Sequence, residues 1–98
     1  MSTKIINPHL EIRTDAPGSG YTMATMNEYP GADCIVCHGG LYFSDLLSWL
    51  DKARAAGKAI ILDGIDMLTD TAYEDIVDMT ARVNAPEGFK VIGLCTIL

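Results

Sequence analysis

The chain has 98 residues, of which 49% are hydrophobic and 20% are charged. This is the size and composition of one globular domain, and it excludes a disordered chain. Thirteen acidic and seven basic residues give a net charge of −6, so the average surface field repels nucleic acid and anionic lipid. No apolar run has the length of a membrane span or of an export signal. We therefore expect a cytoplasmic protein that binds neither nucleic acid nor membranes.

Two extended segments are expected near the N-terminus. Residues 9–14 and 21–28 flank the segment 15–20, whose proline and two glycines favour a turn. This pattern predicts a β-hairpin made of these two segments.

The rest of the chain alternates strand and helix patterns. Residues 32–38, 58–63 and 89–97 are short apolar runs that predict strands, and the continuous run at 58–63 is typical of a strand buried on both faces. Apolar residues recur at helical spacing in 44–57 and in 71–83. Each of these two segments is therefore predicted to be a helix.

The predicted fold is a single α/β domain of residues 1–98 with the order β-β-β-α-β-α-β. Strands joined through helices by short connections lie parallel with right-handed crossovers. The last three strands should therefore be parallel, with both helices packed on a mixed sheet. Residues 1–31 are expected to form the N-terminal hairpin and turn at one edge, and residues 32–98 the α/β core.

The run Cys34-Ile35-Val36-Cys37-His38 has the spacing of a c-type haem attachment site or of a redox dithiol. In a strand, however, an odd separation places Cys34 and Cys37 on opposite faces of the sheet. A zinc site also lacks ligands, because only His9 and Cys95 remain. We expect the thiols to fill the core, with no metal and no cofactor. A redox or haem-binding protein remains an alternative.

An enzyme is not expected from this sequence. The two histidines, His9 and His38, lie in or near predicted strands, where no Ser-His-Asp arrangement can be assembled. The acidic residues after residue 62 lack the spacing and the glycine of an EF-hand, so a solvated loop and helix face explains them better.

Three stretches together resemble the STAS domain, the fold of anti-sigma-factor antagonists and of the cytoplasmic tails of sulphate transporters. They are residues 39–45 (GGLYFSD), 59–71 (AIILDGIDMLTDT) and 89–94 (FKVIGL). The resemblance implies a STAS-like fold and a regulatory role in which the domain docks a protein partner. It also implies that Thr71, which follows Asp70, is a phosphorylation site that controls partner binding.

Thr71 also has a purely structural interpretation. With Glu74 three residues later, it fits the capping box of a helix N-terminus. The helix cap and the phosphorylation site are therefore alternative roles for the same hydroxyl.

The expected contact surface is the loop and helix start at residues 64–73. Trp49 joins it as a large aromatic residue outside the apolar stripe of its helix. The expected partner is another protein, of unknown identity, or a second copy of the chain. The alternative is a small acidic inhibitor or decoy that blocks a basic partner surface with its second helix. The candidate partner-binding residues are Trp49, Asp66, Met67, Leu68, Asp70, Thr71 and Tyr73.

Overall fold

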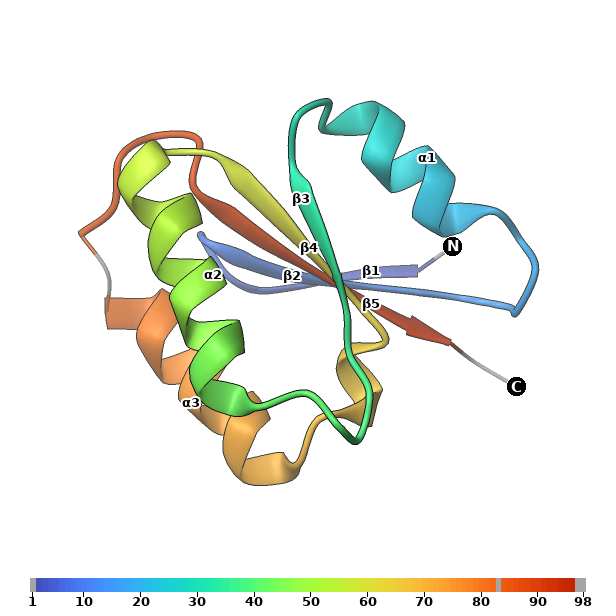
Figure 1. Ribbon diagram of the computed structural model, residues 1–98. Helices are drawn as coiled ribbons and strands as arrows, with labels where there is room; N and C mark the ends of the chain where they lie inside the picture. The colour runs from blue at the N-terminus through green and yellow to red at the C-terminus, as the bar shows by residue number, and fades with distance from the viewer. Residues whose placement is uncertain (1, 83, 97–98) are drawn as a thin grey trace.

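The computed structural model describes residues 2–82 and 84–96. These residues form one five-stranded mixed sheet with the order β1-β2-β5-β4-β3, and three α-helices (Figure 1). The strands are β1 (Ser2–Asn7), β2 (Leu10–Asp15), β3 (Asp33–Val36), β4 (Ala59–Asp63) and β5 (Lys90–Thr96). The helices are α1 (Tyr21–Glu28), α2 (Phe43–Ala56), the short 3-10 helix η1 (Ile65–Met67) and α3 (Asp70–Arg82).

The strand directions confirm the predicted parallel core. β3, β4 and β5 are parallel neighbours, β2 is parallel to β5, and only β1 is antiparallel to its neighbour within the described residues. The predicted helices at 44–57 and 71–83 correspond to α2 and α3, and both pack on the sheet. Val83 and Ile97, which ended a predicted helix and a predicted strand, lie outside the described residues.

The prediction for residues 21–28 is wrong, because this segment is α1 and not a strand. The hairpin lies earlier in the chain, between β1 and β2, and its turn is closed by Asn7, whose Oδ1 accepts the backbone N–H of His9 at 2.9 Å. An Asn-Pro pair is a turn signal, and Asn7-Pro8 could have revealed this hairpin. Residues 2–31 thus hold a hairpin and a helix, and the order of elements is β-β-α-β-α-β-α-β.

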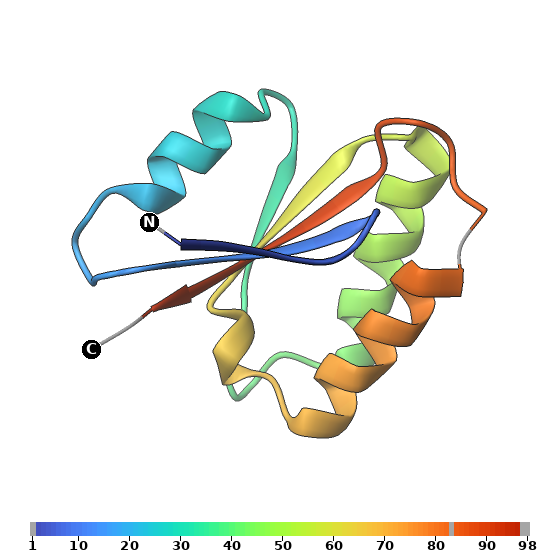
Figure 2. The ribbon, with the colours of Figure 1, turned by 180° about the vertical axis from the view of Figure 1, so that it is seen from behind.

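The two faces of the sheet are covered unequally. Helices α2 and α3 lie side by side on one face, and α1 lies alone on the other (Figures 1 and 2). The two-helix face holds the larger buried cluster, to which strands and helices contribute. Its fully buried members include Leu10, Leu46, Leu50, Ile60, Leu62, Ile76 and Val91.

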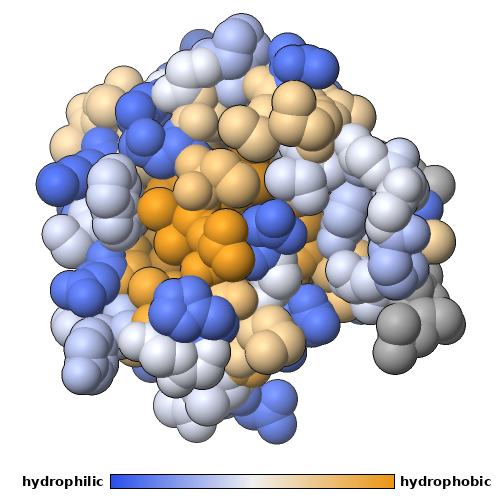
Figure 3. All heavy atoms as spheres, turned by 45° about the vertical axis from the view of Figure 1, so that its right-hand side comes forward, coloured by the Kyte–Doolittle hydropathy of each residue, from blue (hydrophilic) through white to orange (hydrophobic). Residues whose placement is uncertain are grey.

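Helix α1 covers its face only in part. It has eight residues, of which Tyr21 and Thr25 are buried, and no side chain caps its N-terminus at Gly20. Val36 at the end of β3 is 61% exposed, and Figure 3, which turns the α1 side of Figure 1 forward, shows hydrophobic side chains gathered in the middle of the view. The apolar residues buried on this face are Ala59, Ile61, Ile92 and Leu94.

A chain of four charged side chains fastens α1 to the sheet. Arg13 donates from Nε to Glu11 at 2.8 Å, and from Nη1 and Nη2 to the two carboxylate oxygens of Glu28 at 2.6 and 3.1 Å. Lys90 pairs with the other oxygen of Glu11. Glu11 is 3% and Arg13 is 8% exposed. Ionised groups are rarely buried unless they are paired, so this network accounts for the polar interior beneath α1.

Helix η1 approaches the sheet closely, and Gly93 permits this approach. A Cβ added at Gly93 would lie 2.6 Å from Cδ1 of Ile65 and 2.8 Å from Cδ1 of Ile12. The glycine therefore sets the depth at which η1 and the start of α3 sit. None of the helices in the described ranges is long and apolar enough to cross a membrane.

Candidate functional site

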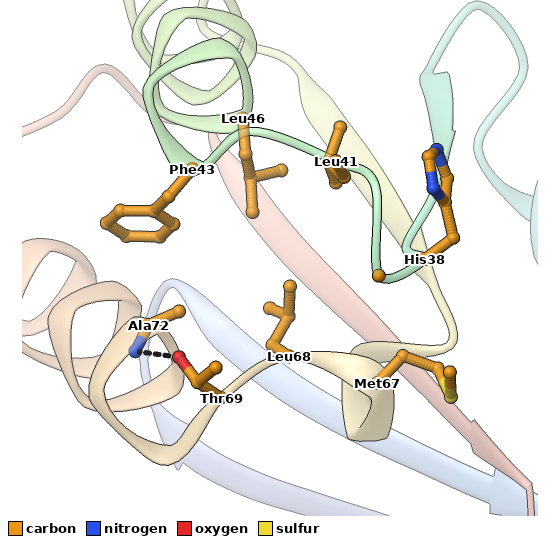
Figure 4. Close-up of a pocket in the computed structure, with 9 residues that line it drawn as sticks. His38, Leu41, Phe43, Leu46, Met67, Leu68, Thr69 and Ala72 are labelled. Atoms are coloured by element: carbon orange, nitrogen blue, oxygen red, sulfur yellow. Dashed lines mark hydrogen bonds between the residues drawn. The ribbon is translucent and has the colours of Figure 1, made fainter.

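The loops that follow β3 and β4 meet at one end of the sheet. The carboxyl ends of parallel strands meet at one edge of a sheet, where α/β proteins commonly bind their ligands. Here the two loops and the first turns of α2 and α3 enclose a cavity of about 150 Å³ (Figure 4). Its apolar walls are Leu41, Phe43, Leu46, Met67, Leu68 and Ala72.

The two polar side chains that line this first cavity form hydrogen bonds with the backbone of its wall. His38 accepts the N–H of Gly40 at Nδ1, with a distance of 3.1 Å. Thr69 accepts the N–H of Ala72 at Oγ1, with a distance of 3.2 Å (Figure 4). No aspartate, glutamate, lysine or arginine is among the described residues that line this cavity. The first cavity is therefore suited to an apolar group.

A second cavity, of about 250 Å³, lies on the other side of Leu68. It opens between α3, η1 and the strands β2 and β5, and Leu68 lines both cavities. The second cavity differs from the first because two carboxylates join its apolar walls. The other residues that line it are Ile12, Ile65, Asp66, Asp70, Tyr73 and Cys95.

The acidic residues are concentrated in one segment of the sequence, and two of them line the second cavity. The segment 63–80 contains six of the thirteen acidic residues and none of the seven basic ones. The remainder of the chain holds seven acidic and seven basic residues and is neutral overall. The acidic residues of the segment are Asp63, Asp66, Asp70, Glu74, Asp75 and Asp78.

The capping prediction for Thr71 is wrong, because the cap is Thr69. The side chain of Thr69 accepts the N–H of Ala72, and its carbonyl accepts the N–H of Tyr73 at 2.9 Å. This is the geometry of an N-cap residue. Thr71 lies one position after the first residue of α3, and its side chain is exposed.

Replacing Thr69 with alanine should therefore lower the free energy of unfolding by about 1 kcal/mol, the typical cost of losing an N-cap. Thr71→Ala removes the same hydroxyl from an exposed position and should change stability by less than about 0.5 kcal/mol. Urea unfolding of both variants, followed by circular dichroism, measures the difference. Equal costs for the two substitutions would contradict the assignment of the cap.

The structure brings most of the predicted contact residues together. Met67 and Leu68 line the first cavity, and Asp66, Asp70 and Tyr73 line the second. Trp49 does not join them, because it lines neither cavity. It is 38% exposed on α2, and Nζ of Lys52 lies 4.9 Å from its ring centroid.

Cys34 and Cys37, the two cysteines of the Cys-x-x-Cys run, lie on opposite faces of the sheet, as their spacing predicts. Cys37 belongs to the buried cluster beneath α2 and α3, and Cys34 packs against the cluster beneath α1. Burial and the nearby carboxylate of Asp63 raise the pKa of both thiols, that of Cys37 to about 11. Protonated thiols are poor nucleophiles and poor metal ligands. No cluster of three or more metal-ligating side chains occurs among residues 2–82 and 84–96.

Sequence reasoning missed one wall of the first cavity. His38 and Leu41 come from the loop after β3 and Phe43 from the start of α2, and all three lie more than 20 residues before η1 in the chain. The available signal was topological, since parallel neighbouring strands bring their following loops to the same edge.

Comparisons of this chain with protein-family models, with curated proteins and with solved structures find no match.

Proposed function

We propose that this chain is a non-enzymatic, STAS-like regulatory module of the cytoplasm that docks a protein partner through residues 64–73. The observation that carries the proposal is the first cavity, an apolar hollow beside the side chain of Met67. Met67 is 60% exposed, although exposing a large apolar side chain gains nothing for the folded chain. Exposed methionine beside an apolar cavity is typical of a surface that packs against another protein.

The charge of this surface supports a partner with basic residues. The segment 63–80, which includes Asp66 and Asp70 of the second cavity, carries six acidic residues and no basic ones. Complementary charge speeds encounter and selects among partners. A partner with lysine and arginine around an apolar contact therefore fits this surface best.

Met67→Asp should remove this contact and reduce capture of the partner at least about tenfold, because it places a charge in an apolar interface. The matched control is Met23→Asp, since Met23 on α1 is 62% exposed, about the same as Met67. Both variants and the unchanged protein are used as baits in a lysate of the source organism, and mass spectrometry quantifies each captured protein. A partner that binds all three baits equally, or the absence of any specific partner, would refute the proposal.

A second candidate is an acidic inhibitor that covers a basic partner surface with α3. The absence of basic residues from segment 63–80 favours it. In that case, capture should depend on salt and on Asp75 and Asp78, which line neither cavity, and should be insensitive to Met67→Asp. The double variant Asp75→Lys/Asp78→Lys separates the two candidates.

Phosphorylation of Thr71 remains a prediction. The hydroxyl is exposed in the first turn of α3, next to Asp70. A phosphate there would add negative charge to a surface that is already acidic, so its expected effect is on the affinity for the partner.

A further inference from the structure

The two cavities beside Leu68 differ in chemistry, and we infer that the partner segment places an apolar side chain in the first and a lysine or arginine side chain in the second. This inference rests on the proposed function, because it specifies the chemistry of the partner for the same surface. It follows from the walls, the volumes and the charges of the two cavities.

The second cavity matches the two parts of a long cationic side chain. Lysine and arginine have an apolar stem and a charged head. Ile12, Ile65 and Tyr73 supply an apolar wall for the stem, and Asp66 and Asp70 supply carboxylates for the head. The aromatic ring of Tyr73 also provides a face that attracts cations. The volume of about 250 Å³ leaves room for one such side chain.

The two carboxylates of this cavity are free within the described residues. No hydrogen bond or ion pair there involves the side chain of Asp66 or of Asp70. Four of the seven basic side chains, Arg13, Arg54, Lys58 and Lys90, pair with other carboxylates. Lys4 is the register partner of Ile12, which lines this cavity, and within the described residues it forms no ion pair with Asp66 or Asp70.

No acidic residue is among the described residues that line the first cavity, and six of its lining residues are apolar. Its volume of about 150 Å³ suits a single apolar side chain. Only Leu68 is shared by the two cavities. Residues two apart in an extended segment point to the same side and are separated by about 7 Å. An extended segment with an apolar residue and a basic residue in alternate positions would therefore present both side chains to these neighbouring cavities.

A symmetric dimer formed through this surface is a poor arrangement. Two copies of segment 63–80 would then bring six acidic residues each to one interface, and like charges directly opposed across an interface cost several kcal/mol. The occupant that complements the charge of this surface is therefore a different, basic polypeptide.

A library of random 12-residue peptides displayed on phage tests the inference directly. The unchanged protein should enrich peptides that carry lysine or arginine close to a large apolar residue. One enriched peptide is then made synthetically with a fluorescent label, and its Kd is measured by anisotropy. Asp66→Asn/Asp70→Asn should weaken binding at least tenfold, whereas Asp75→Asn/Asp78→Asn, which removes the same charge outside the cavities, should weaken it less than threefold.

The peptide provides a second test that leaves the protein unchanged. Replacing its basic residue with norleucine should also weaken binding at least tenfold, so a folding defect in the protein variants could not account for the result. Enrichment without a basic residue, or equal effects of the two double variants, would overturn the inference. If Met67→Asp still weakens the binding of a peptide enriched without a basic residue, the proposed function survives. If Met67→Asp weakens the binding of none of the enriched peptides, the proposed function fails as well.

Discussion

Arg13→Met should lower the free energy of unfolding by about 3 kcal/mol, the lower end of the cost of breaking a buried ion pair. Methionine keeps most of the apolar volume but leaves Glu11, which is 3% exposed, with Lys90 as its remaining partner. It also removes the two hydrogen bonds that hold Glu28 at the end of α1. Urea unfolding monitored by circular dichroism measures the loss.

Glu28→Gln is the matched control for this network. The side chain of Glu28 is 52% exposed, and a half-exposed ion pair contributes less than about 1 kcal/mol. The expected order of stability is therefore the unchanged protein, then Glu28→Gln, and then Arg13→Met well below both. Equal losses in the two variants would show that the buried Glu11–Arg13 contact contributes little.

Acid should weaken the same network. Burial raises the pKa of Glu11, but the hydrogen bonds from Lys90 and Arg13 outweigh it, and the net shift is below the ordinary value of 4.5. A carboxyl whose pKa is lower in the folded state contributes stability above its unfolded pKa, and this contribution is lost as the pH falls through the folded value. Stability should therefore fall below pH 4.5 more steeply in the unchanged protein than in Arg13→Met.

Hydrogen exchange should locate the effect in α1. This helix has eight residues, its N-terminal Gly20 provides no side-chain cap, and Glu28 places a negative charge at its C-terminal end, where the helix dipole disfavours one. Its stability must then come from contacts with the sheet. In Arg13→Met, we expect the α1 amides to exchange faster while those of β4 retain their protection relative to global unfolding.

The same features explain why this helix could not be predicted. Tyr21, Thr25 and Glu28 recur at helical spacing, but two of them are polar, and their burial or pairing depends on Arg13 in β2. A hydrophobic pattern cannot report contacts with a distant charged residue. Strand β1 could not be predicted either. Its first four residues are exposed, so hydropathy does not distinguish one face of the strand from the other.

The parallel core could be predicted because its buried residues form recognisable apolar patterns in the sequence. β4 is buried over its first four residues and reads as a continuous apolar run, and α2 presents Leu46, Leu50 and Ala53 at helical spacing. Only half of the candidate site could be predicted from the sequence. Residues 66–73 are contiguous, whereas the opposite wall of the first cavity depends on how the loop after β3 lies against α3.

The unequal cover of the sheet predicts different costs for two neighbouring substitutions in β4. Ile60 lies beneath α2 and α3, Ile61 lies beneath α1, and both are fully buried. The cost of removing a large side chain grows with the cavity that remains. The two long helices on one face are both held against the sheet and resist collapse, whereas α1 is short and can move toward the sheet. We therefore expect a loss of about 4 kcal/mol for Ile60→Ala and about 2 kcal/mol for Ile61→Ala.

Guanidinium unfolding of both variants, with the slope against denaturant compared between them, measures these losses. Unchanged slopes would show that the difference arises in the folded state. A larger loss for Ile61→Ala would mean that α1 is held rigidly over its face. In that case the charged network would hold α1 in place, and adding Arg13→Met to both variants should remove the difference between their losses of unfolding free energy.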